Sequence, residues 1–177
     1  MRELFAIFLG VVLAGGLIYG AFTLYTDTAT QVSAATTIEQ VQEMGAKLAA
    51  RYKTRATGYG TTAGTAIGDR TMVAFAMAAS GMAVTGSGAT TRLVSEWNSD
   101  VTVTGQKTYV TIGIDDIPGE ACRAILSSLE AGSGVTSVKV GSGTAKTVPW
   151  SDTDIYASSA CGEGSAAVDM VFHTGHL

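Results

Sequence analysis

The chain has 177 residues, which suits one domain, or one domain with an appended segment. Its formal net charge is -4 at pH 7, and its eleven lysines and arginines are scattered. This pattern argues against a nucleic-acid partner, because phosphate binding needs clustered cations. One N-terminal run raises the hydrophobic fraction to 46%, and the chain beyond residue 25 is long enough to bury an ordinary core.

The first 25 residues predict a membrane stage. Residues 4–25 carry no charge, and a helix of about 21 residues spans about 32 Å, enough to cross the hydrocarbon core of a bilayer. A cleavable signal peptide fits poorly, because Arg2 stands beside an acid and the apolar run exceeds the usual length. We therefore expect residues 1–25 to form a retained hydrophobic helix and residues 26–177 to form a globular domain.

Glu3 stands at the start of this apolar run. An acid within a membrane costs about 2.5 kcal/mol or more unless it is paired. The α-amino group of a neighbouring copy could be the partner; Arg2 is the alternative, although adjacent residues on a helix do not face each other well. Glycines within the run permit close packing between helices or local loosening of the helix: Gly10, Gly15, Gly16 and Gly20.

The helix is expected to continue to about residue 54, because no proline interrupts it. Its second half, residues 26–54, carries an apolar stripe that should lie on the core of the domain. Cations at residues 51–55 are expected to be a solvated helix end. The stripe consists of Ala34, Ile38, Val41, Gly45, Leu48 and Tyr52.

Residues 54–69 are rich in glycine and threonine and predict an extended loop. Residues 71–83 lack alternation and are rich in alanine and methionine, which predicts a short buried helix. Its large apolar side chains are expected to fill the core: Met72, Phe75, Met77 and Met82.

The remainder of the chain predicts a mainly antiparallel sheet. Residues 101–103 and 107–115 alternate apolar and polar residues, which predicts a hairpin across residues 104–107. Asp116 and Pro118 predict the start of a helix that ends near Gly132. Further strands are expected at 135–140 and 167–172, with a hairpin turn at 141–147 and with Trp97 and Trp150 packed against the sheet. The fold class is therefore α+β.

Cys122 and Cys161 are the only cysteines. An even count behind an export-like segment favours a disulfide over two buried thiols. Neither cysteine has the spacing of a metal site, and no phosphate loop or nucleophile elbow is present. His173 and His176, near the end of the chain, are expected to lie in a frayed tail. We therefore expect no cofactor, no metal and no enzymatic activity.

Three stretches together resemble the type IV pilins, and more closely the type IVb subgroup: SEWNSDVTV (95–103), YVTIGIDDIPGEACRAILSSL (109–129) and ACGEGSAAVDMVF (160–172). They are similar to the family's strand, its turn into a helix with the first cysteine, and its closing cysteine with the last strand. The order GDR, MAASGMAV, EWNSDVTV is most similar to the thin-pilus major pilins of conjugative plasmids and their enterobacterial relatives.

The resemblance implies the type IV pilin fold and a major structural subunit of an extracellular filament, used in adhesion, aggregation or conjugative mating-pair contact. The implied partners are further copies of the chain, a prepilin peptidase, the pilus assembly machinery, the inner membrane before assembly, and a host or recipient cell surface. The family's acid normally stands fifth and pairs with a neighbour's N-methylated amino terminus, whereas Glu3 stands third. The residues expected to act in assembly are Met1, Glu3, Leu4, Phe5, Phe8, Leu9, Leu13 and Leu17, with Gly15, Gly16 and Gly20 for packing or loosening.

Two alternatives remain at this point. A minor pilin or secretion pseudopilin shares the architecture and differs in copy number and partners. A membrane-anchored periplasmic enzyme or binding domain would need a polar pocket with perturbed acids or bases.

Overall fold

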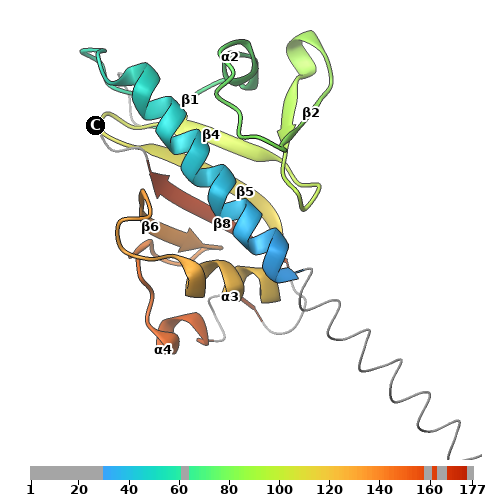
Figure 1. The fold of residues 1–177 in the computed structure, drawn as a ribbon, viewed down its shortest axis with the longest axis vertical. Helices are drawn as coiled ribbons and strands as arrows, with labels where there is room; N and C mark the ends of the chain where they lie inside the picture. The colour runs from blue at the N-terminus through green and yellow to red at the C-terminus, as the bar shows by residue number, and fades with distance from the viewer. Residues whose placement is uncertain (1–29, 61–63, 158–160, 163–166, 175–177) are drawn as a thin grey trace, which may run out of the picture.

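The computed structural model describes residues 30–60, 64–157, 161–162 and 167–174. In this part of the chain a long helix, residues 30–52, lies across one face of an antiparallel sheet, and α3 (Gly119–Ser128) lies beside the first turns of that helix (Figure 1). The α+β architecture predicted from the sequence is confirmed. The apolar segment 4–25 lies outside the described residues, and among the described helices none is long and apolar enough to cross a membrane.

The main sheet has six strands in the order β1-β4-β5-β8-β6-β7, and β2 and β3 form a separate two-stranded ribbon. The predicted hairpin is confirmed as β4 and β5, and the predicted turn at 141–147 connects β6 to β7. The strands are β1 (Thr65–Ala66), β2 (Ala83–Thr85), β3 (Arg92–Val94), β4 (Val101–Gly105), β5 (Val110–Pro118), β6 (Val135–Val140), β7 (Lys146–Thr147) and β8 (Ala167–Thr174).

The last strand occupies the middle of the sheet. In β8, Phe172 pairs with Ile112 of β5 on one side and with Val138 of β6 on the other, and all three side chains are fully buried. Side chains of residues that pair directly across neighbouring strands point to the same side of the sheet, so these three line the face covered by the helix. The end of the chain therefore joins the two halves of the sheet.

The predicted apolar stripe of the helix is confirmed, since all six of its residues are buried. The buried face is wider than the stripe and also includes Thr37, Gln40 and Met44. The cations at residues 51–55 are exposed, as expected of a solvated helix end.

The helix expected over 71–83 is wrong in extent. Only α2 (Asp69–Ala74) is helical, and at Ala76 the backbone turns through a φ of 51° toward the long helix. Met72 and Met77 are buried and Met82 is partly buried, but Phe75 is 51% exposed. Phe75 is not core filling, because it lies at the C-cap of this short helix, where the Arg51 guanidinium stacks on its ring.

The start of α3 also differs from the prediction. Asp116 does not cap the helix; it has a φ of 54° in an irregularity of β5 between Ile114 and Ile117. β5 then pairs again with β8 as far as Pro118, which occupies the N-cap position. The helix ends at Ser128, before Gly132, because Leu129 returns to an extended conformation.

His173 is not part of a frayed tail. β8 continues to Thr174, and His173 pairs with Thr111 of β5 and Ser137 of β6. Its ring lies 5.2 Å from the ring of Tyr109. His176 lies outside the described residues.

Candidate functional site

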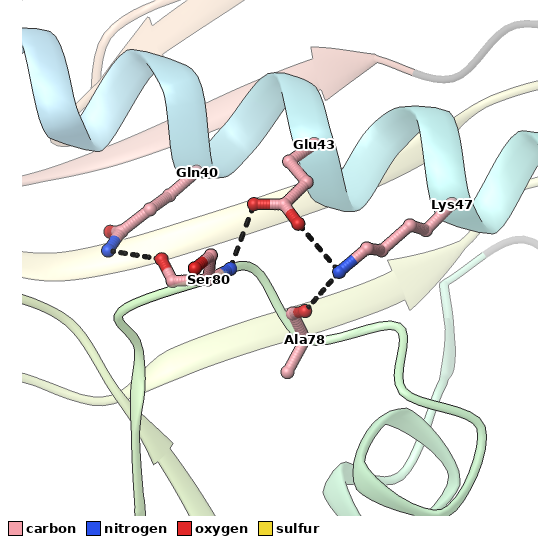
Figure 2. Close-up of polar contacts among 5 residues, drawn as sticks. All are labelled: Gln40, Glu43, Lys47, Ala78 and Ser80. Carbon is pink, nitrogen blue, oxygen red and sulfur yellow. Dashed lines mark hydrogen bonds and ion pairs between the residues drawn. The ribbon is translucent and has the colours of Figure 1, made fainter.

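A polar clamp fixes the segment after α2 to the long helix (Figure 2). Its members are Gln40, Glu43 and Lys47 on the helix, with the backbone of Ala78 and Ser80. The Ser80 N–H donates to Glu43 Oε2 at 2.8 Å, and Lys47 Nζ lies 2.7 Å from Glu43 Oε1 and donates to the Ala78 carbonyl at 2.8 Å. The Lys47 ammonium lowers the pKa of Glu43, and the Ser80 N–H has a smaller effect in the same direction, because both favour the carboxylate form.

The turn between β3 and β4 makes a second contact with the helix. Trp97 is partly buried against the core, and its Nε1–H donates to Thr37 Oγ1 at 3.0 Å. Ser33 Oγ donates to Glu96 Oε1 at 3.2 Å, one turn earlier on the helix. Asn98 gives this turn a φ of 58°, a left-handed conformation that asparagine tolerates better than most residues.

A third contact joins the helix to the end of β8. At Gly45 a Cβ atom would lie 2.6 Å from Thr174 Oγ1, and that hydroxyl donates to the Gly134 carbonyl at 2.6 Å. Glycine is therefore required for the close approach of helix and strand. The clamp, the Trp97 turn and Gly45 hold the helix to the domain at points spread along residues 33–47.

The predicted disulfide is confirmed between Cys122 and Cys161, both almost fully buried, with Cα atoms 5.7 Å apart. It ties α3 to the chain segment just before β8. Arg123 Nη2 adds a hydrogen bond to the Gly162 carbonyl at 2.7 Å. The loop closed by the bond contains β6, β7 and α4 (Asp152–Ile155). In it, Trp150 is partly buried against the core, as expected.

The described residues contain no group of three His, Cys, Asp or Glu side chains placed to hold a metal ion. One groove of about 360 Å³ has walls from β1, β3 and β4, with Asp69, Arg92 and Asp100 among its lining residues. Burial, with repulsion from Asp100 as a smaller cause, raises the pKa of Asp69. Arg92 Nη1 pairs with Asp100 Oδ2 at 3.0 Å. The groove offers charges of both signs and apolar walls.

The structure brings together only some of the residues singled out from the sequence. The proposed assembly residues, Met1 to Gly20, lie outside the described residues. The sequence reasoning missed the polar clamp and the Trp97 contact. The spacing of Glu43 and Lys47 is a helical i,i+4 signal that could have found half of the clamp. Its loop partners, more than 30 residues away, leave no such signal.

Comparison with known proteins agrees with this architecture. The family model described as PilS N terminal matches residues 30–174, most of the chain. No curated protein matches the chain significantly. Among solved structures, the type IV b pilin from Salmonella typhi is similar in fold: the TM-score is 0.51 and the identity 22%, covering 74% of this chain and 95% of that one. The chain therefore belongs to the PilS family of type IVb pilins, the subunits of type IV pili.

Proposed function

We propose that the chain is the major structural subunit of a type IVb pilus, an extracellular filament that serves adhesion, aggregation or conjugative mating-pair contact. The observation that carries the proposal is the fastening of the 30–52 helix to the sheet and loops by the polar clamp, the Trp97 turn and the Gly45 contact. A helix held at several points can pass a pull on residues 1–25 to the whole domain. A subunit that bears load in a filament needs this property.

In this mechanism residues 1–25 lie in the inner membrane before assembly and then form the filament core, while residues 26–177 form the outer domain. A prepilin peptidase frees the amino group of Met1, which becomes N-methylated, and the assembly machinery adds each copy. The residues proposed to pack in the core are Met1, Leu4, Phe5, Phe8, Leu9, Leu13 and Leu17, with Gly15, Gly16 and Gly20 allowing close approach.

Glu3 sets the register between copies in this proposal. Its carboxylate neutralises the amino terminus of a neighbour inside an apolar bundle, and a register error leaves a buried charge unpaired. Such errors are costly, so one spacing between subunits is favoured.

The test is negative-stain microscopy of material sheared from expressing cells, with the intact mass of the same sample. We expect thin filaments whose principal protein has the mass of this chain plus one methyl group. Filaments that contain the chain only in trace amounts would identify a minor pilin instead. Protein that stays in the membrane fraction, with no filaments, would overturn the proposal.

A further inference from the structure

Two segments at one end of the domain carry cations and no acids. Residues 48–60 and 101–109 contain Arg51, Lys53, Arg55 and Lys107 and no aspartate or glutamate. The two segments lie together, because the ring of Tyr52 packs on Tyr59 and the backbone of Tyr59 lies against Gly105 at the end of β4. We call these four cations the basic end.

The basic end is presented outward. All four side chains are exposed, and in the described part of the chain none of them forms an ion pair. Arg51 lies 4.1 Å above the ring of Phe75 and Arg55 lies 4.7 Å above the ring of Tyr52, so both guanidinium groups are held in place. Cations held on aromatic faces lose little further freedom when they meet a partner.

The other end of β4 is acidic. Asp100 stands about 17 Å from Gly105 at the spacing of an extended strand, and the Asp115 N–H donates to the Asp100 carbonyl at 3.4 Å. Burial raises the pKa of Asp115, followed by repulsion from Asp169, Asp116 and Asp100. Among the described cations, Arg92 alone forms an ion pair with any of these aspartates, through Asp100. Arg70 instead donates to the Gly88 carbonyl. We call Asp69, Asp100, Asp115, Asp116 and Asp169 the acidic end.

The groove described above opens at the acidic end. Asp69 and Asp100 lie on it, and its apolar walls come from Ile67, Leu93 and Val101. The lining carries two acids and one cation, Arg92, which pairs with Asp100. The acids outnumber the cation, and apolar walls beside them suit lysine and arginine, whose side chains combine an apolar stem with a cationic head. The partner that fits by charge is the basic end of a second copy of this chain.

We propose that neighbouring copies join head to tail, with the basic end of one copy seated on the acidic end and groove of the next. The inference rests on the proposed function and adds the contact between globular domains to it. The two surfaces lie at different places on one chain, so each copy offers one of each. A head-to-tail contact joins two different surfaces, so it can repeat from copy to copy, and it gives an open filament where the rotation between copies does not close a ring.

The test uses two charge-reversed forms of the full chain, expressed separately and together. The basic-end variant carries Lys53→Glu and Lys107→Glu; the acidic-end variant carries Asp69→Lys and Asp115→Lys. We expect each alone to lower the yield of sheared filaments at least about tenfold, because like charges then face each other. Expressed together, the two should form mixed filaments at close to the wild-type yield, because each variant complements the other.

Controls separate this contact from folding and from net charge. The thermal stability of each full-length variant in detergent checks the fold, and Asp69→Asn with Asp115→Asn supplies a milder change if the reversal unfolds the chain. Glu39→Lys with Glu130→Lys makes the same change in net charge as the acidic-end variant, at exposed sites, and should leave the yield unchanged. Wild-type yield from either folded reversal variant alone, or no recovery on co-expression, would overturn the inference while the proposed function stands. Absence of wild-type filaments would remove both.

Discussion

At the scale of single residues, Gly45 is a position within a helix where glycine should be more stable than alanine, the reverse of the usual order. Alanine in place of glycine within a helix usually stabilises by about 1 kcal/mol. Here the new Cβ would lie 2.6 Å from Oγ1 of Thr174, a residue that is almost fully buried. Overlap of this kind costs about 1–3 kcal/mol and outweighs the gain in helix propensity.

We therefore expect Gly45→Ala to lower the free energy of unfolding by about 1–2 kcal/mol, measured by chemical denaturation. In a double-mutant cycle, Thr174→Ala should relieve part of this loss, because it removes the hydroxyl that the Cβ meets. Ala35→Gly, at an exposed site on the same helix, should cost about 1 kcal/mol from propensity alone. A stabilising Gly45→Ala would mean that helix and strand do not approach this closely.

Glu43 gives a prediction about pH. Its pKa in the folded protein is lowered from the usual 4.5, so its contribution is complete above pH 4.5 and is lost as the pH falls through the folded-state pKa. The Glu43 side chain is 37% exposed, so solvent limits the contribution to less than about 1 kcal/mol.

We expect Glu43→Gln to lower stability at pH 7 and to have little effect at acid pH below the folded-state pKa, measured by thermal unfolding across pH. The matched substitution Glu39→Gln changes an exposed side chain of the same helix and should not reproduce this difference between neutral and acid pH. An equal loss from Glu43→Gln at both pH values would show that the ion pair with Lys47 is not its source.

At the scale of elements, the disulfide controls the C-terminal part of the domain. It joins residues 39 apart in the sequence, and the chain-entropy model gives about 4 kcal/mol for a loop of this length. The bond also lies next to β8, the strand that joins the two halves of the sheet. Loss of the bond should therefore lower the stability of the entire sheet.

We predict that the double variant Cys122→Ala and Cys161→Ala unfolds at a markedly lower temperature than the wild type, with a loss of a few kcal/mol. Reduction of the wild type should have a similar effect, and reductant should not shift the melting temperature of the double variant further. A melting temperature of the wild type that does not change in reductant would contradict a structural role for the bond.

Sequence patterns predict well those elements that bury one face and expose the other to solvent. The long helix, β4, β5 and β6 each bury one face, so apolar residues recur with the period of the element. β1 and β2 bury none of their residues and leave no such pattern. The predicted helix over 71–83 failed because alanine and methionine suit both a helix and the irregular segment that follows Ala74.

At the scale of the whole molecule, the proposed function makes Glu3 the residue on which assembly depends. We expect Glu3→Ala to abolish filaments or to make them irregular, because the amino terminus of a neighbour would lose its counter-charge in an apolar bundle. The readout is microscopy of sheared material together with the amount of the chain in the membrane fraction. Glu39→Ala is the control, and regular filaments from Glu3→Ala would refute the pairing.

The sequence by itself determined the class of this protein. Its apolar segment, helical stripe, strand alternation and pair of cysteines are local patterns, and local patterns follow from the period of each element and from the solvent on each side of it. They were sufficient to predict an α+β domain with a Cys122–Cys161 bond, while the pilin family was indicated by the resemblance of residues 95–103, 109–129 and 160–172. The role proposed for Glu3 also starts from the sequence alone, since it rests on the cost of a charge in an apolar medium.

Only the tertiary structure decided which distant groups meet. The polar clamp joins Lys47 to the backbone of a residue 31 positions away, and Trp97 reaches Thr37 across 60 positions. Gly45 faces Thr174 because the last strand enters the middle of the sheet. The separation of a basic end from an acidic end likewise depends on how β4 brings two segments to opposite ends of one strand. These pairings depend on the packing of the whole chain, which no local pattern of residues records.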